Sequence, residues 1–314
     1  MTTLQRLAHW RDSGAISGDQ YDVISTIVRK DRFSVFLELN ALLYLGVLSF
    51  IAGIGWVIQA YVTTLGDDVI FSALTIILAA CFYYCFSRAR SYSPGQVESP
   101  TLAFDYILYL GCLTFGLEIG YLESRFHLMQ AEWDYYLLIS AGLFFVLAYR
   151  FDNRFVLSLG LSTLAGWFGI RMSRLGFFFG SSLRPSALFY GAVVIAGAIL
   201  LYGGNIKKHF TETYFHVAAI VLFGALLSGV FDEAATLYLF ALLGLSAAAI
   251  GGGIRFKRFA FVAYGIVFGY LGISARVLTH VRIDTTVGLT YLVVSGVLVL
   301  LFTTLLARRF GREA

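Results

Sequence analysis

Residues 37–62 read LELNALLYLGVLSFIAGIGWVIQAYV and are almost wholly apolar over 26 positions. The hydrocarbon core of a bilayer is about 30 Å thick, and about 20 helical residues cross it. In lipid, backbone N–H and C=O groups are satisfied only within a helix or a closed barrel, and this run is too long for a barrel strand. The stretch is therefore predicted to be a transmembrane helix.

The composition of the whole chain is that of a membrane protein with several spans. Of the 314 residues, 59% are hydrophobic and 13% are charged, whereas soluble domains have about a quarter charged. The 32 glycines suit a membrane bundle, because small residues let helices approach closely. Cys81, Cys85 and Cys112 all lie in apolar runs and are expected to be buried hydrophobic side chains. The sequence predicts no metal site and no cofactor.

Apolar runs like the first recur to the end of the chain. The predicted fold class is an all-α membrane bundle of ten transmembrane helices over residues 35–314, after a cytoplasmic helical hairpin over residues 1–34. A charged stretch precedes the first apolar run, so no cleavable signal peptide is expected. The predicted spans are residues 37–62, 69–86, 102–122, 135–149, 155–171, 187–203, 214–230, 234–251, 259–278 and 286–307.

The N-terminal hairpin has clear boundary signals. Gly14 is placed to end a first helix, and Ser17 and Gln20 have the spacing of a capping box at the start of a second. Two helices of two to three turns bury too little area to be stable alone. We therefore expect the hairpin to dock on the membrane domain or on a protein partner.

The orientation follows from lysine and arginine in the short loops. With the N-terminus inside, six of the 23 basic residues lie outside, which leaves 23 − 6 = 17 on the cytoplasmic side. Both termini are therefore predicted to be cytoplasmic. These basic residues are spread over separate loops, so no nucleic-acid partner is expected. The outer six are Arg125, Arg171, Arg174, Arg184, Arg276 and Arg282.

The hairpin and the first membrane helix together carry a family pattern. Its residues are Trp10, Gly14, Ile16, Ser17, Gln20 and Ile24, followed by Tyr44, Leu45, Gly46 and Gly53. This pattern resembles a family of bacterial predicted membrane proteins, a domain of unknown function (DUF2157), in which the same hairpin precedes a glycine-rich multi-helix region. The likeness is specific over about residues 4–60 and is compositional beyond them. It implies a protein of the bacterial inner membrane, and it brings no catalytic motif.

Glu118 is the strongest functional candidate. An ionisable group inside a membrane helix costs free energy, and such groups usually have a function. It lies between Gly116 and Gly120, about one turn inside the outer end of its helix. Arg276 and Arg171 lie at similar depth, so either could pair with the carboxylate. The alternatives are a substrate or ion pathway, and a carboxylate that only reaches the interface or fastens the bundle.

Asp105 is a second candidate for that pathway, near the cytoplasmic end of the same helix. A role at the helix terminus, or a carboxylate that reaches the interface, is favoured over a proton relay. Thirteen residues separate Asp105 from Glu118, which places them on different helix faces. The two are therefore not expected to form a carboxylate pair.

The outer loop over residues 171–186 departs from the positive-inside pattern. Its aromatic residues could lie in the headgroup layer while its arginines meet lipid phosphates. The alternative is an ordinary belt of interfacial aromatic residues. The candidate lipid-contact residues are Arg174, Phe177, Phe178, Phe179 and Arg184.

Three classes of function remain open. Glycine-rich helices, intramembrane charges and the likeness of residues 43–56 to residues 108–121 favour a secondary transporter or a permease for a small molecule or lipid. A membrane scaffold or sensor that recruits a partner through the hairpin is the alternative. A membrane enzyme is the least favoured, because the sequence holds no catalytic constellation.

Overall fold

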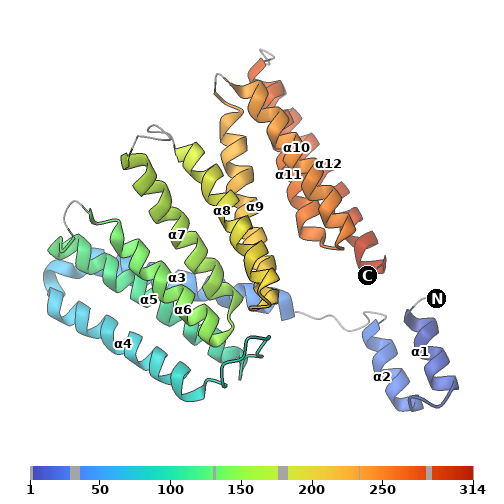
Figure 1. The fold of residues 1–314 in the computed structure, drawn as a ribbon, viewed down its shortest axis with the longest axis horizontal. Coiled ribbons are helices and arrows are strands. Elements are labelled where there is room, and N and C mark those ends of the chain that lie inside the picture. Colours follow the sequence, from blue (N-terminus) through green and yellow to red (C-terminus); the bar gives the residue numbers. More distant parts are fainter. Residues whose placement is uncertain are drawn as a thin grey trace. The chain divides into compact units, whose positions relative to one another are not determined.

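The computed structural model describes residues 3–28, 36–129, 132–175, 183–232, 234–280 and 285–313, and the regular structure in these ranges is helical (Figure 1). Its contacts form two compact units, Met1–Ala60 and Tyr61–Ala314, and α3 crosses the division between them. The predicted domain boundary at residue 34 lies outside the described residues. The helices are α1 (Thr3–Asp12), α2 (Gly18–Val28), α3 (Phe36–Leu65), α4 (Asp67–Arg88), α5 (Leu102–Phe126), α6 (Tyr135–Phe151), α7 (Arg154–Leu175), α8 (Leu183–Gly203), α9 (Thr211–Gly229), α10 (Ala235–Arg255), α11 (Phe259–His280) and α12 (Thr285–Glu313).

The N-terminal hairpin consists of α1 and α2, with the predicted boundary signals in place. Gly14 has φ +73°, a left-handed conformation that favours glycine and ends α1. The Ser17 hydroxyl accepts a hydrogen bond from the Gln20 backbone N–H at 3.2 Å, and the Ser17 N–H donates to Gln20 Oε1 at 2.9 Å. The capping box is therefore confirmed. Inside the hairpin the Arg11 guanidinium lies 4.7 Å from the centre of the Tyr21 ring.

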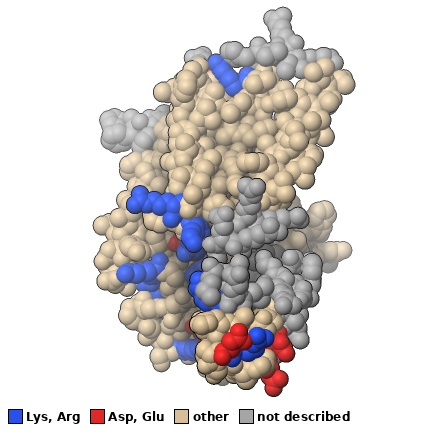
Figure 2. All heavy atoms as spheres, turned by 90° about the vertical axis from the view of Figure 1, so that its right-hand side faces the viewer, with Lys and Arg blue, Asp and Glu red and all other residues tan. Residues whose placement is uncertain are grey.

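Each of the ten predicted membrane spans corresponds to one helix from α3 to α12. Of the helices in the described residues, eight are long and apolar enough to cross a membrane, and the apolar segments Leu45–Tyr61 and Tyr135–Phe151 are shorter. The 17-residue α6 is roughly 26 Å long at 1.5 Å per residue, close to the thickness of the hydrocarbon core. Figure 2 shows one face of the molecule, and most of the described atoms on it belong to residues other than lysine, arginine, aspartate and glutamate. The multi-pass membrane bundle is thus confirmed.

Several helices extend about a turn or more beyond the predicted spans, and α8 is one of them. Residues 187–203 were predicted as a span, whereas α8 already begins at Leu183 and includes Pro185. Proline lacks a backbone N–H, but the N–H groups of a first helical turn have no intrahelical acceptor in any case. Pro185 therefore lies within the helix without interrupting it.

Successive helices of the second unit pack as hairpins. The closest pairs are α4 with α5, α6 with α7, α8 with α9, and α10 with α11, and each pair also contacts the next along the chain (Figure 1). Two glycines show how close this packing is. A Cβ atom on Gly272 would lie 2.3 Å from Leu242 Cδ2, and one on Gly265 would lie 2.6 Å from the Ser246 carbonyl oxygen. A side chain at position 265 would meet backbone, whereas one at position 272 would require the Leu242 side chain to move.

The hairpin arrangement gives the second unit two ends, which we name after one residue of each. The Asp67 end holds the start of α4 and the connections α5–α6, α7–α8, α9–α10 and α11–α12. The Asp152 end holds the connections α4–α5, α6–α7, α8–α9 and α10–α11.

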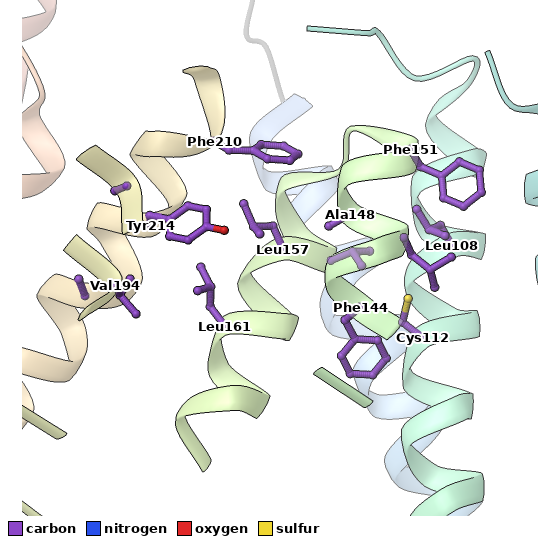
Figure 3. Close-up of a cluster of buried hydrophobic side chains, with 14 of the residues drawn as sticks. Leu108, Cys112, Phe144, Ala148, Phe151, Leu157, Leu161, Val194, Phe210 and Tyr214 are labelled. Carbon is purple, nitrogen blue, oxygen red and sulfur yellow. The ribbon is translucent and has the colours of Figure 1, made fainter. Parts of the chain in front are cut away.

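A continuous apolar core joins α5, α6, α7, α8 and α9. Figure 3 shows Phe144 and Ala148 of α6 lying toward Cys112 and Leu108 of α5. On the other side of α6, Leu157 of α7 belongs to the same buried cluster, which continues to α8 and α9. The three cysteines are free and buried, as the sequence predicted.

Candidate functional site

Glu118 of α5 is buried against α4, with 6% of its surface exposed. The Thr75 hydroxyl lies 2.5 Å from Glu118 Oε1 and also 3.0 Å from the Phe71 carbonyl oxygen. A hydroxyl has one hydrogen and can donate to only one of these acceptors. When Thr75 donates to Phe71, a hydrogen bond to Glu118 requires a protonated carboxyl group as its donor.

The second oxygen of this carboxyl, Oε2, has no hydrogen-bond partner among the described residues. The same holds for two further buried hydroxyl groups, Thr114 Oγ1 of α5 and Ser140 Oγ of α6. Thr114 lies one turn from Glu118 on the same helix face. Ser140 lies one turn from Phe144, whose ring centre is 6.4 Å from that of Phe115. The adjoining parts of α5 and α6 therefore hold several polar atoms with unused bonding capacity.

Between Glu118 and the Asp67 end, α4 and α5 are joined by a second polar contact. The Tyr121 hydroxyl donates to Asp67 Oδ1 at 2.6 Å, and Arg125 Nε lies 2.9 Å from both Asp67 oxygens. These residues lie about one and two turns beyond Glu118 along α5. Glu118 is thus one to two turns deeper in the bundle than the polar residues of α5 at this end.

The expected ion pair between Glu118 and an arginine is not formed. Arg276 of α11 donates to the Thr236 hydroxyl of α10 at 3.1 Å. Arg171 of α7 pairs with Glu132, from the connection before α6. Both arginines lie at helix ends and reach partners at the Asp67 end, and so the hypothesis of a buried Glu118–arginine pair was wrong.

The other arginines of the predicted outer loop also have carboxylate partners. Arg174 Nη1 lies 2.6 Å from Asp134 Oδ1, and Arg184 pairs with Asp232. Their positive charges are therefore balanced by carboxylates of the protein itself. Phe177, Phe178 and Phe179 lie outside the described residues, and lipid contact by this loop stays a prediction.

Asp105 lies at the Asp152 end in a polar network of helix termini. Its Oδ1 accepts hydrogen bonds from the Ser99 hydroxyl at 2.7 Å and from Asn153 Nδ2 at 2.8 Å. Asn153 in turn accepts from the Val156 N–H at 2.9 Å through its side-chain oxygen, which caps the start of α7. Asp105 therefore connects α5 to the turn between α6 and α7.

A buried ion pair next to this network was missed from the sequence. Asp152 and Lys207 each have a side chain only 1% exposed, and Lys207 Nζ lies 2.9 Å from Asp152 Oδ2 and 3.0 Å from the Gly95 carbonyl oxygen. The Val97 N–H donates to the same carboxylate at 2.5 Å, and His209 Nε2 contacts its other oxygen. The cluster ties together the connections α4–α5, α6–α7 and α8–α9.

The sequence held only a weak signal for this cluster. Lys207 is one of many cations in the short loops, and Asp152 lies between two predicted spans, residues 135–149 and 155–171. The turn itself was readable, because Asp152 takes φ +60°, which aspartate and asparagine tolerate best among non-glycine residues. Nothing in the order of residues indicates that Asp152 and Lys207 meet, 55 positions apart.

Comparison with known proteins supports the membrane class. Residues 8–157 match a family model described as predicted membrane protein (DUF2157). No curated protein and no solved structure matches the chain. The family match extends well past residue 60, where the specific likeness in the sequence ended, and it includes Asp105, Glu118 and Asp152. Residues 8–157 of this multi-pass membrane protein are therefore similar to the predicted membrane protein family DUF2157.

Proposed function

We propose that this protein is a secondary transporter or permease for a small molecule or lipid, in which Glu118 binds and releases a proton. The observation that carries the proposal is the environment of this one carboxyl group. It is buried inside a membrane helix, with the Thr75 hydroxyl on one oxygen and no partner on the other among the described residues.

The cost of such a group is the first argument for a role in transport. A carboxylate in the hydrocarbon region requires a partner of opposite charge or neutralisation by a proton. Arg171 and Arg276 have other partners, which favours a proton as the means of neutralisation. Loss of that proton would leave a buried charge, which favours a conformation in which Glu118 reaches water.

The neighbouring polar atoms are the second argument. Thr114 and Ser140 are buried hydroxyl groups without partners among the described residues. Hydroxyl groups both donate and accept, so they can hold water or substrate atoms beside a carboxyl group when a helix moves. The polar network at the Asp152 end differs, because both oxygens of Asp152 have partners and Oδ1 of Asp105 has two, which suits a fixed structural role.

A scaffold or sensor is the alternative function. The observation that favours it is the N-terminal hairpin, a well-capped pair of helices on which Trp10 keeps 46% of its surface exposed. In that case residues 1–34 recruit a protein partner and Glu118 only stabilises the bundle.

The proposed location is the bacterial inner membrane, with both termini in the cytoplasm. Ten crossings return the chain to its starting side, and most of the lysine and arginine residues then face the cytoplasm. The paired arginines at the Asp67 end fit the outer side, because their charges are balanced by Glu132, Asp134 and Asp232.

Side-specific thiol labelling tests the transport proposal. Thr114→Cys, with the three native cysteines replaced by alanine, places a thiol one turn from an intact Glu118. A membrane-impermeant reagent is applied to each face of sealed vesicles at several pH values. The proposal predicts reaction from either face in a pH-dependent manner, and loss of the pH dependence in Glu118→Gln.

The matched control is Leu157→Cys, which lies in the core cluster and is fully buried. It should stay unreactive under every condition. If Thr114→Cys is also unreactive, or reacts from one face only at every pH, the transport proposal fails. A deletion of residues 1–34 that removes the biological phenotype, while Glu118→Gln retains it, would then favour the scaffold.

A further inference from the structure

A pocket of about 340 Å³ lies between α7, α8 and α9, away from Glu118. Small-molecule sites begin at about 300 Å³, so the pocket is large enough for part of an extended ligand. Its walls are mostly apolar side chains and glycine backbone within membrane-spanning segments. The lining residues that bear on the argument are Phe168, Gly169, Ser186, Ala187, Tyr190 and Val221.

Of the described lining residues, only Ser186 and Tyr190 have polar side chains. The Tyr190 hydroxyl donates to the Leu161 carbonyl oxygen at 2.6 Å and is thereby used within the protein. Ser186 is fully buried, and its Oγ has no hydrogen-bond partner among the described residues. A buried hydroxyl without a partner is unfavourable. An acceptor atom on a bound molecule would satisfy it.

The depth of Ser186 indicates which acceptor is available. Ser186 lies three residues after the start of α8 at Leu183, roughly 4.5 Å along the helix axis. The neighbouring Arg184 pairs with Asp232 at the Asp67 end of the bundle. Ser186 is thus about one turn inside the charged boundary of the bundle, where the ester carbonyl groups of phospholipids join their acyl chains.

The charges around the pocket do not select a charged headgroup. Arg171, Arg174 and Arg184 at this end each have a carboxylate partner. Recognition therefore rests on the apolar walls and on Ser186. Both match an acyl chain attached through an ester.

We propose that this pocket binds one phospholipid through an acyl chain, whose ester carbonyl oxygen accepts a hydrogen bond from Ser186 Oγ. The chain lies against Phe168 and Tyr190, whose rings are 5.8 Å apart between centroids. Gly169 leaves the room for it, because a Cβ atom there would have only Leu183 nearby, at 3.9 Å. The site is separate from Glu118 and does not depend on the transport proposal.

Photolabelling of the purified full-length protein tests this site. The probe is a phosphatidylethanolamine with a diazirine within one acyl chain, titrated into detergent micelles, with labelled residues located by mass spectrometry. We expect saturable labelling of the α7 and α8 residues that line the pocket. Gly169→Leu should fill the pocket and reduce this labelling at least tenfold. Ser186→Ala should weaken binding about fivefold, as for the loss of one neutral hydrogen bond.

The control is Val193→Leu, on an exposed part of α8, which should leave labelling unchanged. If Gly169→Leu does not purify as a folded protein, Ala187→Leu fills the same pocket. Labelling that does not saturate, or that is unchanged in both the filled variant and Ser186→Ala, would overturn the proposal. Competition by a free fatty acid as strong as that by unlabelled phosphatidylethanolamine would overturn the ester contact.

Discussion

The ion pair between Asp152 and Lys207 predicts a large loss of stability when one partner is neutralised. Asp152→Asn keeps the size of the side chain and one carbonyl oxygen, but it removes the negative charge. The Lys207 ammonium would then retain the Gly95 carbonyl oxygen and the Tyr92 ring, 5.3 Å away, and would be a buried charge without a counterion. Removing one partner of a buried pair costs about 3–5 kcal/mol. Because Asp152 joins three connections, we expect a loss in this range.

The free energy of unfolding can be measured in mixed micelles by titration with a denaturing detergent. The matched control is Glu132→Gln, which breaks the exposed pair with Arg171. This variant should lose far less free energy of unfolding than Asp152→Asn. The double variant Asp152→Asn with Lys207→Met should regain part of the loss, because no charge then remains buried. A loss in Asp152→Asn no larger than in Glu132→Gln would refute the reasoning.

Three further predictions follow from close contacts. Gly265→Ala should lower the free energy of unfolding by about 3 kcal/mol in the same assay, because the new Cβ would meet a backbone carbonyl oxygen at 2.6 Å. This value is the upper end of the cost of overpacking. Its control is Gly251→Ala, where a Cβ would have nothing within 4 Å, and the protein should be equally or more stable. Thr75→Val should lower the free energy of unfolding by about 1–3 kcal/mol, because it removes the hydrogen-bond partner that Glu118 has among the described residues. Thr75→Ser keeps the hydroxyl and should retain the stability. Ser17→Ala should raise amide hydrogen exchange in α2 about fivefold in the full-length protein, as expected for a capping loss of about 1 kcal/mol, whereas Ser13→Ala should not; equal exchange in both variants would contradict the capping role.

The helices were predictable because each is determined by residues next to one another. An apolar run of about 20 residues in lipid has to close its backbone hydrogen bonds within itself, which makes a helix the outcome whatever lies beside it. The capping box is equally local, since Ser17 and Gln20 are three residues apart. The start of α8 is less local, since proline breaks a helix in most positions and Pro185 is tolerated only because it lies in the first turn.

The partners of the charged residues were not predictable in the same way. Glu118 contacts Thr75, which is 43 positions away in the sequence. Only arginines were expected as partners, so a threonine hydroxyl was not predicted. Arg171 and Arg276 could be placed at the correct end of the bundle, but their partners depend on how helix ends face one another. Lys207 and Asp152 form an ion pair only because two separate connections pack together.

The most direct test of the central proposal is infrared difference spectroscopy of the reconstituted protein between two pH values. A protonated carboxyl group has its own C=O stretching band. We predict that a band of this kind appears at the lower pH and vanishes at the higher, is lost in Glu118→Gln, and is retained in Asp105→Asn. A difference spectrum that Glu118→Gln leaves unchanged over the whole pH range would contradict proton exchange at Glu118, and with it the proposed coupling.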